Sequence, residues 1–196
     1  QVPRLYHSSA VLLPDARVLF AGGGRCGACT VDHYDAQIFS PPYLFLDDST
    51  AAVRPQILAA PAQVSYGQAF TVQTPSALGI ARVTWVRLPA TTHSFNQNQW
   101  FNELSFTAAA GALTVTAPAT AYQAPPGHYM LFILDSAGVP SVASMVQIVG
   151  SAPLPGAPGT PAAPSALGTA PIDSQRIRLL WTDRSTSETA FLIERC

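Results

Sequence analysis

Between residue 54 and about residue 149, short runs rich in β-branched and aromatic residues alternate with turns that contain glycine or proline. Such runs, bounded by turn residues, are typical of β-strands, and helical periodicity is hard to find anywhere in the chain. The pattern predicts strands at residues 69–73, 81–88, 102–107, 112–116, 127–135 and 141–149.

This spacing of strands favours one fold class. Six or seven short strands within roughly 95 residues are typical of an immunoglobulin-like β-sandwich. We assign residues 53–149 to it, and we expect its core to contain the large apolar side chains of Trp85, Phe106, Tyr129 and Phe132.

The first 52 residues show a different pattern. Apolar runs at residues 6–13 and 17–21, joined by a Pro-Asp turn and closed by three glycines, are similar to the inner hairpin of a kelch-type propeller blade. A third strand is expected at residues 35–39. Because a propeller needs several blades to bury their faces, residues 1–52 are expected to form one blade of an incomplete propeller.

The C-terminal part divides into a linker and a short strand-forming segment. Residues 150–168 are almost entirely proline, alanine and glycine, which is typical of a semi-extended linker. Residues 169–196 resemble the first three strands of a fibronectin type III domain, at 170–172, 177–183 and 188–195. The predicted fold class is therefore all-β: a partial blade, a sandwich, a linker and an incomplete fibronectin type III domain.

One polar loop, residues 91–99, presents His93 together with four carboxamide side chains. A tip that only turned the chain between two strands would need two to about five residues, often with glycine. A single histidine in a loop is commonly only solvated or hydrogen-bonded. We nevertheless expect the loop to deliver His93 to a metal that is held mainly by another segment, which begins at Tyr6 and His7.

Composition limits the classes of partner. Charged residues make up 11% of the chain, all basic residues are arginine, and the net charge is −1. Nucleic acids and anionic membranes attract proteins with a basic patch, so neither partner is expected. No apolar run approaches the roughly 20 residues that a membrane-spanning helix needs. The chain enters a strand pattern almost at once, as if cut from a longer parent protein.

Of the three cysteines, Cys26 and Cys29 form a C-x-x-C motif. This spacing occurs in redox pairs, in half-sites for zinc and in small structural disulfides. No βαβ pattern surrounds the motif, which disfavours the redox pair, and a second pair of zinc ligands is missing. A local disulfide is favoured, and it would indicate an oxidising compartment and a secreted or extracellular protein. Cys196 has no evident partner.

Seven segments of the first 149 residues match one known family in a single register: residues 4–8, 12–15, 22–29, 35–39, 87–94, 126–132 and 135–141. Together they resemble the galactose oxidase and glyoxal oxidase family of copper radical oxidases. The part that they resemble is the family's last propeller blade and the early-set sandwich that follows it.

The resemblance implies a mononuclear copper site with Tyr6, His7 and His93 as ligands. Tyr6 would supply an axial phenol that accepts the hydroxyl proton of an alcohol, and the imidazoles of His7 and His93 would hold the metal. Nitrogen and oxygen donors suit Cu(II), and a phenol can act as a general base. The Cys26–Cys29 pair is similar to a small disulfide of the family.

In this family the oxidant is a second tyrosine, thioether-linked to a cysteine, on earlier blades. Neither residue of this Tyr–Cys radical cofactor lies within the sequence. We therefore expect the parent protein, together with its N-terminal propeller blades, to oxidise a primary alcohol or aldehyde and to reduce O₂ to H₂O₂. The chain by itself is expected to bind copper weakly and to be inactive.

Two other functions stay open. The linker and the fibronectin-like segment are typical of modular extracellular proteins, so the chain could be a non-catalytic carbohydrate-binding or adhesion module. A thiol–disulfide redox protein is a third possibility, disfavoured by the absence of a helix at the C-x-x-C motif. His33 is interpreted as a structural or exposed residue and His128 as a packing residue, and neither is expected to be a ligand.

Overall fold

The computed structural model describes residues 4, 6–24, 32–150, 164–173 and 176–184. The chain forms two compact units, Gln1–Pro153 and Leu154–Cys196, and each is described by itself. Cys26, Cys29, Cys196 and most of the predicted linker lie outside the described residues, so the disulfide stays a prediction.

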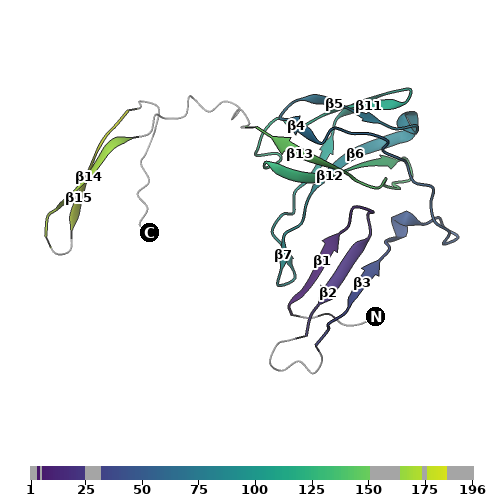
Figure 1. The fold of residues 1–196 in the computed structure, drawn as a ribbon, viewed down its shortest axis with the longest axis horizontal. Helices are drawn as coiled ribbons and strands as arrows, with labels where there is room; N and C mark the ends of the chain where they lie inside the picture. Colours follow the sequence, from purple (N-terminus) through teal and green to yellow (C-terminus); the bar gives the residue numbers. More distant parts are fainter. Residues whose placement is uncertain (1–3, 5, 25–31, 151–163, 174–175, 185–196) are drawn as a thin grey trace. The chain divides into compact units, whose positions relative to one another are not determined.

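The first unit opens with a three-stranded antiparallel sheet (Figure 1). Its strands, in spatial order, are β1 (Ser8–Leu12), β2 (Val18–Gly22) and β3 (Ala36–Phe39). The Asp15 carboxylate accepts a hydrogen bond from the backbone N–H of Arg17 and closes the turn between β1 and β2, as predicted for the Pro-Asp sequence. A short 3₁₀ turn, η1 (Pro42–Leu44), leads away from β3.

Two sheets facing each other form most of the rest of this unit (Figure 1). One has five strands, in the order β4 (Gln63–Ser65), β13 (Ser144–Val149), β12 (Gly127–Asp135), β6 (Ile80–Arg87) and β9 (Phe101–Leu104). The other has three strands, in the order β10 (Phe106–Ala109), β11 (Ala112–Thr116) and β5 (Ala69–Gln73), and a 3₁₀ turn, η2 (Ala77–Gly79), follows β5. The predicted all-β class with a sandwich is confirmed.

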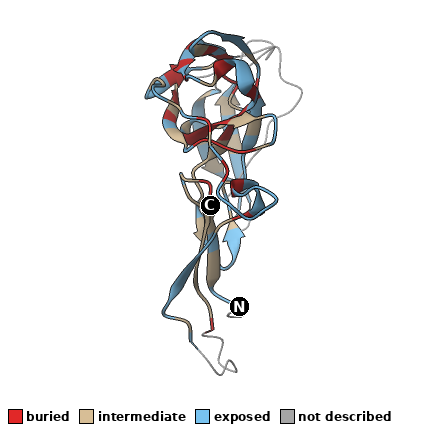
Figure 2. Cartoon of the chain, turned by 90° about the vertical axis from the view of Figure 1, so that its right-hand side faces the viewer, coloured by how far each residue is buried: buried red, intermediate tan, exposed pale blue. Residues whose placement is uncertain are grey.

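The core lies between these two sheets, where the buried residues concentrate (Figure 2). In β5 and β11, buried and exposed positions alternate, because successive side chains of a strand point to opposite faces. The inward residues meet around Trp85 and Tyr129, whose ring centroids are 4.6 Å apart. Of the four predicted core residues, Trp85 and Tyr129 are buried in this core and Phe106 is half-buried against it. Phe132 is also buried, but in a second cluster on the other face of its strand.

Strand β12 is buried on both faces, which explains its continuous apolar sequence. Tyr129, Leu131 and Ile133 point into the sandwich core. Met130 and Phe132, on the opposite face, form a second apolar cluster with residues of the propeller-like part, including Leu12 and Ala16. The sandwich therefore presents an apolar outer face on which the β1–β2 hairpin is seated.

The strand predicted at residues 102–107 is divided in the structure. Phe101–Leu104 pairs with β6 in the five-stranded sheet, and Phe106–Ala109 pairs with β11 in the three-stranded sheet. Leu104 and Phe106 both contribute to the core, so the side-chain alternation continues across Ser105 while the backbone changes sheets. The prediction of one continuous strand was wrong, because the alternation of apolar and polar residues does not show with which strand a segment pairs.

Tyr129 gives a prediction about alkaline stability. Its side chain is fully buried and its hydroxyl donates to the Pro125 carbonyl at 2.6 Å. Burial raises the pKa of Tyr129 to about 12, above the value of about 10 in an unfolded chain. The protonated phenol therefore stabilises the fold fully below pH 10, and this contribution, on the order of 2–3 kcal/mol, is lost as the pH rises toward 12.

Urea unfolding of the chain between pH 9 and pH 12 measures this loss. The matched variant Tyr129→Phe lacks the titrating group, so its stability should fall less steeply over the same interval. Equal slopes for the two proteins would show that Tyr129 does not control alkaline unfolding.

Among its described residues, the second unit contains one antiparallel hairpin, β14 (Ser165–Pro171) and β15 (Ile177–Thr182). Strand β15 agrees with the strand expected at 177–183. Strand β14 is longer than the strand expected at 170–172, and its residues 165–168 were expected in the linker. The strand expected at 188–195 lies outside the described residues, and the fibronectin type III assignment stays a prediction. In the described part of the chain, no helix is long and apolar enough to cross a membrane.

Candidate metal centre

Tyr6 and His7 lie in the turn that immediately precedes β1. The Tyr6 carbonyl accepts a hydrogen bond from the Gly24 N–H at 3.1 Å. Gly22 lies so close that an added Cβ would be 3.1 Å from the His7 carbonyl oxygen, and its φ of +69° also favours glycine. The predicted glycine triplet therefore has a local role, because it lets the backbone approach the Tyr6–His7 turn.

Arg4, two residues before Tyr6, also holds the Tyr6–His7 turn in place. Its guanidinium donates to the Gly22 carbonyl at 2.9 Å and to the Asp35 carboxylate at 2.6 Å, and only 6% of its side chain is exposed. The hydrogen bond from Arg4 lowers the pKa of the Asp35 carboxyl. Arg4 thereby ties the segment before Tyr6 to the adjoining ends of β2 and β3.

His93 lies at the tip of a small hairpin within the polar loop. Strands β7 (Thr91–Thr92) and β8 (Phe95–Asn96) pair antiparallel, with His93 and Ser94 as the two turn residues. Both residues have positive φ, 52° and 64°, the property of type I′ hairpin turns, which favour Asn-Gly. His7 also has positive φ, 64°, and such strain in non-glycine residues is frequent at functional sites.

The loop's amides brace its backbone. The Asn96 carboxamide oxygen accepts hydrogen bonds from the N–H groups of Ala90 and Asn98, and the Asn98 amide donates to the Leu88 carbonyl. Gln99 donates to the Asn96 carbonyl at 2.7 Å. The sequence identified these polar residues but not their role, which is to hold the ribbon that presents His93.

The three predicted site residues converge, although 86 positions separate the two histidines. The ring centroids of His7 and His93 are 4.5 Å apart, those of Tyr6 and His7 are 4.1 Å apart, and those of Tyr6 and His93 are 5.9 Å apart. All three side chains are exposed at the surface of the first unit, and 53% of Tyr6 is accessible. Figure 1 shows the β7 ribbon reaching from the sandwich to the side of β1.

Each histidine is followed by a serine, and the two serines join the segments. The Ser94 hydroxyl donates to the Ser8 carbonyl at 2.9 Å, and the two hydroxyl oxygens are 3.1 Å apart. This bridge lies one residue beyond each imidazole. The repeated His-Ser dipeptide was visible in the sequence, but its meaning required the two segments to be neighbours.

The hydrogen bonds of the imidazole rings indicate which nitrogen atoms are free to bind a metal. His93 Nδ1 lies 2.7 Å from the Thr92 hydroxyl oxygen, so Nε2 faces outward from this contact. When Nδ1 carries the proton and donates to Thr92, the lone pair of Nε2 is free to bind a metal. The structure gives the Tyr6 hydroxyl and the His7 ring no hydrogen bond to another described residue.

This donor set suits Cu(II) better than zinc or a hard cation. Within the described ranges, no three His, Cys, Asp or Glu side chains gather as a metal site would require. The convergent groups are instead two imidazoles and a phenol, a nitrogen and oxygen set that Cu(II) prefers in tetragonal surroundings. Three protein donors leave further coordination positions for a substrate or for a ligand from another segment.

The other two histidines lie in different settings. His33 Nδ1 is 3.8 Å from the Asp35 carboxylate, and its side chain is largely buried. His128 is exposed on β12, opposite Gln147 of β13. The interpretation of His33 as a structural or exposed residue stays a prediction, whereas the interpretation of His128 as a packing residue was wrong because its side chain is exposed.

Comparison with known proteins places these features in a family. Residues 54–148 match the model of the galactose oxidase-like early set domain. The chain is 41% identical over 149 residues to a galactose oxidase of Gibberella zeae, which covers 75% of this chain and 22% of that protein. It is 39% identical over 162 residues to the aldehyde oxidase GLOX of Vitis pseudoreticulata, covering 76% of this chain and 30% of that protein.

A solved structure agrees. A fungal alcohol oxidase of the AA5 family, in complex with copper, superposes with a TM-score of 0.70 at 39% identity, over 76% of this chain and 32% of that one. The chain thus spans less than a third of the length of these relatives. Residues 54–148 therefore belong to the galactose oxidase-like early set domain family, and about three quarters of the chain is homologous to the C-terminal region of galactose oxidase and related oxidases.

Proposed function

We propose that the chain is the C-terminal part of a secreted copper radical oxidase and supplies Tyr6, His7 and His93 to its copper site. The reaction converts a primary alcohol to an aldehyde, or an aldehyde hydrate to an acid. Two electrons and two protons leave the substrate, and O₂ takes them up to form H₂O₂. The convergence of the three rings from two distant segments is the observation that supports this proposal.

The three residues have separate roles in the proposal. Bound copper supplies one-electron redox chemistry, which the family pairs with a Tyr–Cys radical from its earlier blades. His7 and His93 hold the metal through imidazole nitrogens, and Thr92 orients the His93 ring. Tyr6 would accept the proton of the substrate hydroxyl at its phenol oxygen.

The rest of the site would come from N-terminal propeller blades. All four residues of β3 are exposed, among them Ile38 and Phe39, which are each about half accessible. An open strand with exposed apolar side chains is covered in most folded proteins. This supports residues 1–52 as one propeller blade. In the proposal the blade is followed by the sandwich at 53–149, the linker at 150–168 and an incomplete fibronectin type III domain at 169–196.

The decisive test is turnover by the intact protein that contains this sequence. Loaded with copper, it should produce H₂O₂ from at least one primary alcohol or aldehyde. Tyr6→Phe should lower kcat by about 10²–10⁴-fold, the usual contribution of a general base, while copper stays bound. Unchanged kcat in this variant would remove the proton-accepting role from Tyr6.

A non-catalytic carbohydrate-binding module is the second candidate, and one observation favours it. Phe95 and Trp100 are partly exposed and line a shallow pocket with Asn96, Gln97 and Gln99. Aromatic faces beside amides suit a sugar ring. Stoichiometric binding of Cu(II) to the intact protein, with loss of binding in site variants, is expected only of the oxidase.

A further inference from the structure

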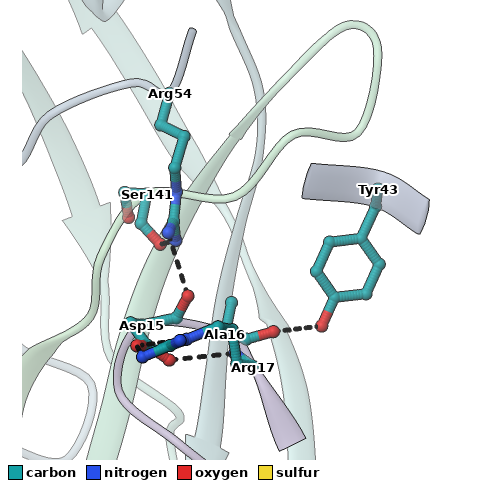
Figure 3. Close-up of polar contacts among 6 residues, drawn as sticks. All are labelled: Asp15, Ala16, Arg17, Tyr43, Arg54 and Ser141. Atoms are coloured by element: carbon teal, nitrogen blue, oxygen red, sulfur yellow. Dashed lines mark hydrogen bonds and ion pairs between the residues drawn. The ribbon is translucent and has the colours of Figure 1, made fainter. Parts of the chain in front are cut away.

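Arg54 lies in the segment between η1 and β4 and joins two parts of the first unit (Figure 3). Its Nε donates to the Pro140 carbonyl at 2.7 Å, and its Nη2 donates to the Ser141 carbonyl at 2.6 Å. Its Nη1 donates to the Asp15 carbonyl at 2.9 Å. Pro140 and Ser141 belong to the sandwich, whereas Asp15 is in the turn of the β1–β2 hairpin, so one guanidinium bonds both.

Only a planar fork can satisfy these three acceptors together. Arginine presents five N–H donors in fixed directions, whereas lysine offers one ammonium that cannot reach three separated carbonyls in this way. The Asp15 carboxylate is already paired with Arg17 at 2.7 Å, which lowers the pKa of Asp15. Arg54 therefore acts chiefly through backbone carbonyls rather than through an ion pair of its own.

Neighbouring contacts fix the same turn. The Tyr43 hydroxyl donates to the Ala16 carbonyl at 2.6 Å, and the Ala143 N–H donates to the Pro14 carbonyl at 2.8 Å. Both bonds end on the turn that Arg54 holds (Figure 3 shows the former). The turn is thus fastened to the sandwich part of the unit by Arg54 and Ala143, and to η1 by Tyr43.

Strand β1 connects this turn to the candidate metal centre. It begins at Ser8, next to His7, and ends at Leu12, next to the turn. Five residues of strand span about 16 Å, so a rotation of about 5° at the turn would move His7 by more than about 1 Å. Metal–ligand distances tolerate about 0.2 Å, and such a movement would separate His7 from a metal shared with His93.

We propose that Arg54 is a positioning residue, which fixes the angle between the β1–β2 hairpin and the sandwich and so holds His7 beside His93. At the opposite end of β1, the Ser8–Ser94 bridge completes the alignment. The geometric part of this proposal is independent of copper, whereas its effect on metal affinity rests on the proposed function.

The geometric part is tested without metal, by nuclear Overhauser effects (NOEs) in the 196-residue chain. The wild-type chain should show a cross-peak between the ring protons of His7 and His93, and another between Trp85 and Tyr129. Arg54→Met should lose the first and keep the second. The matched control Arg82→Met, which breaks an exposed ion pair with Glu103 in the same sandwich, should keep both.

The results that would overturn the proposal are specific. A His7–His93 cross-peak of wild-type intensity in Arg54→Met would show that the guanidinium is not needed. If Arg54→Met also loses the Trp85–Tyr129 cross-peak, its sandwich is disrupted, and the variant Arg54→Lys then tests the proposal. It should retain the sandwich and weaken the His7–His93 cross-peak, and an undiminished cross-peak would overturn the proposal because a fork would then be unnecessary.

A second experiment titrates the intact protein with Cu(II) alone and measures its affinity for the metal. Arg54→Met should bind Cu(II) about 10–100-fold more weakly than wild type, the usual effect of losing a residue that orients ligands, and Arg82→Met should bind like wild type. Absence of His93-dependent Cu(II) binding in the intact wild-type protein would count against the proposed function. The NOE result would still decide the role of Arg54.

Discussion

Replacement of His93 by alanine is expected to lower the affinity of the intact protein for Cu(II) by more than about 100-fold and to abolish copper-dependent H₂O₂ production. Losing a group that only orients a ligand lowers metal affinity by about 10–100-fold, and losing the ligand itself should lower it further. Because His93 lies on the exposed tip of the β7–β8 ribbon, the substitution removes no core contact. Competition titration with a Cu(II) chelator and a peroxide assay measure the two effects.

His128→Ala is the matched control, since it removes an exposed histidine from β12 of the same sandwich. Its copper affinity and turnover should equal those of the wild-type protein. Equal losses in both variants would indicate nonspecific binding by surface imidazoles. Full activity of His93→Ala would exclude His93 as a copper ligand.

Trp85→Ala should lower the free energy of unfolding of the sandwich by about 3–5 kcal/mol, as large aromatic truncations in cores do. The Trp85 side chain is inaccessible to solvent and packs against the ring of Tyr129. Domains are commonly stable by only about 5–15 kcal/mol, so the variant would be close to unfolding. Denaturant titration followed by far-UV circular dichroism measures the change.

Trp100 offers a control of the same residue type. It lies between the polar loop and β9 with 38% of its surface exposed, so Trp100→Ala should change stability by less than about 1 kcal/mol. Strand β6 carries Trp85 and leads into the loop that presents His93, so a Trp85→Ala variant that loses the sandwich should also lose copper binding.

A Trp85→Ala chain of wild-type stability would mean that the core relaxes to fill the cavity left by the indole ring.

The amino-acid sequence by itself determined the all-β class, the approximate positions of most strands and the candidate residues Tyr6, His7 and His93. Strand patterning is local, because alternating side chains and turn residues fix where a strand can form. The same information could not divide residues 102–107 between two sheets, since a strand's pattern does not identify its partner.

Tertiary structure alone decided which distant groups are neighbours. His7 and His93 are far apart in the sequence. Their rings are neighbours because the apolar cluster under β1 and the Ser8–Ser94 bridge hold the two segments together. Arg54 was invisible as a positioning residue because its acceptors are backbone carbonyls, which every residue possesses and no sequence pattern marks. Residue types select the chemistry, but only packing of the hairpin on the sandwich brings that chemistry to one place.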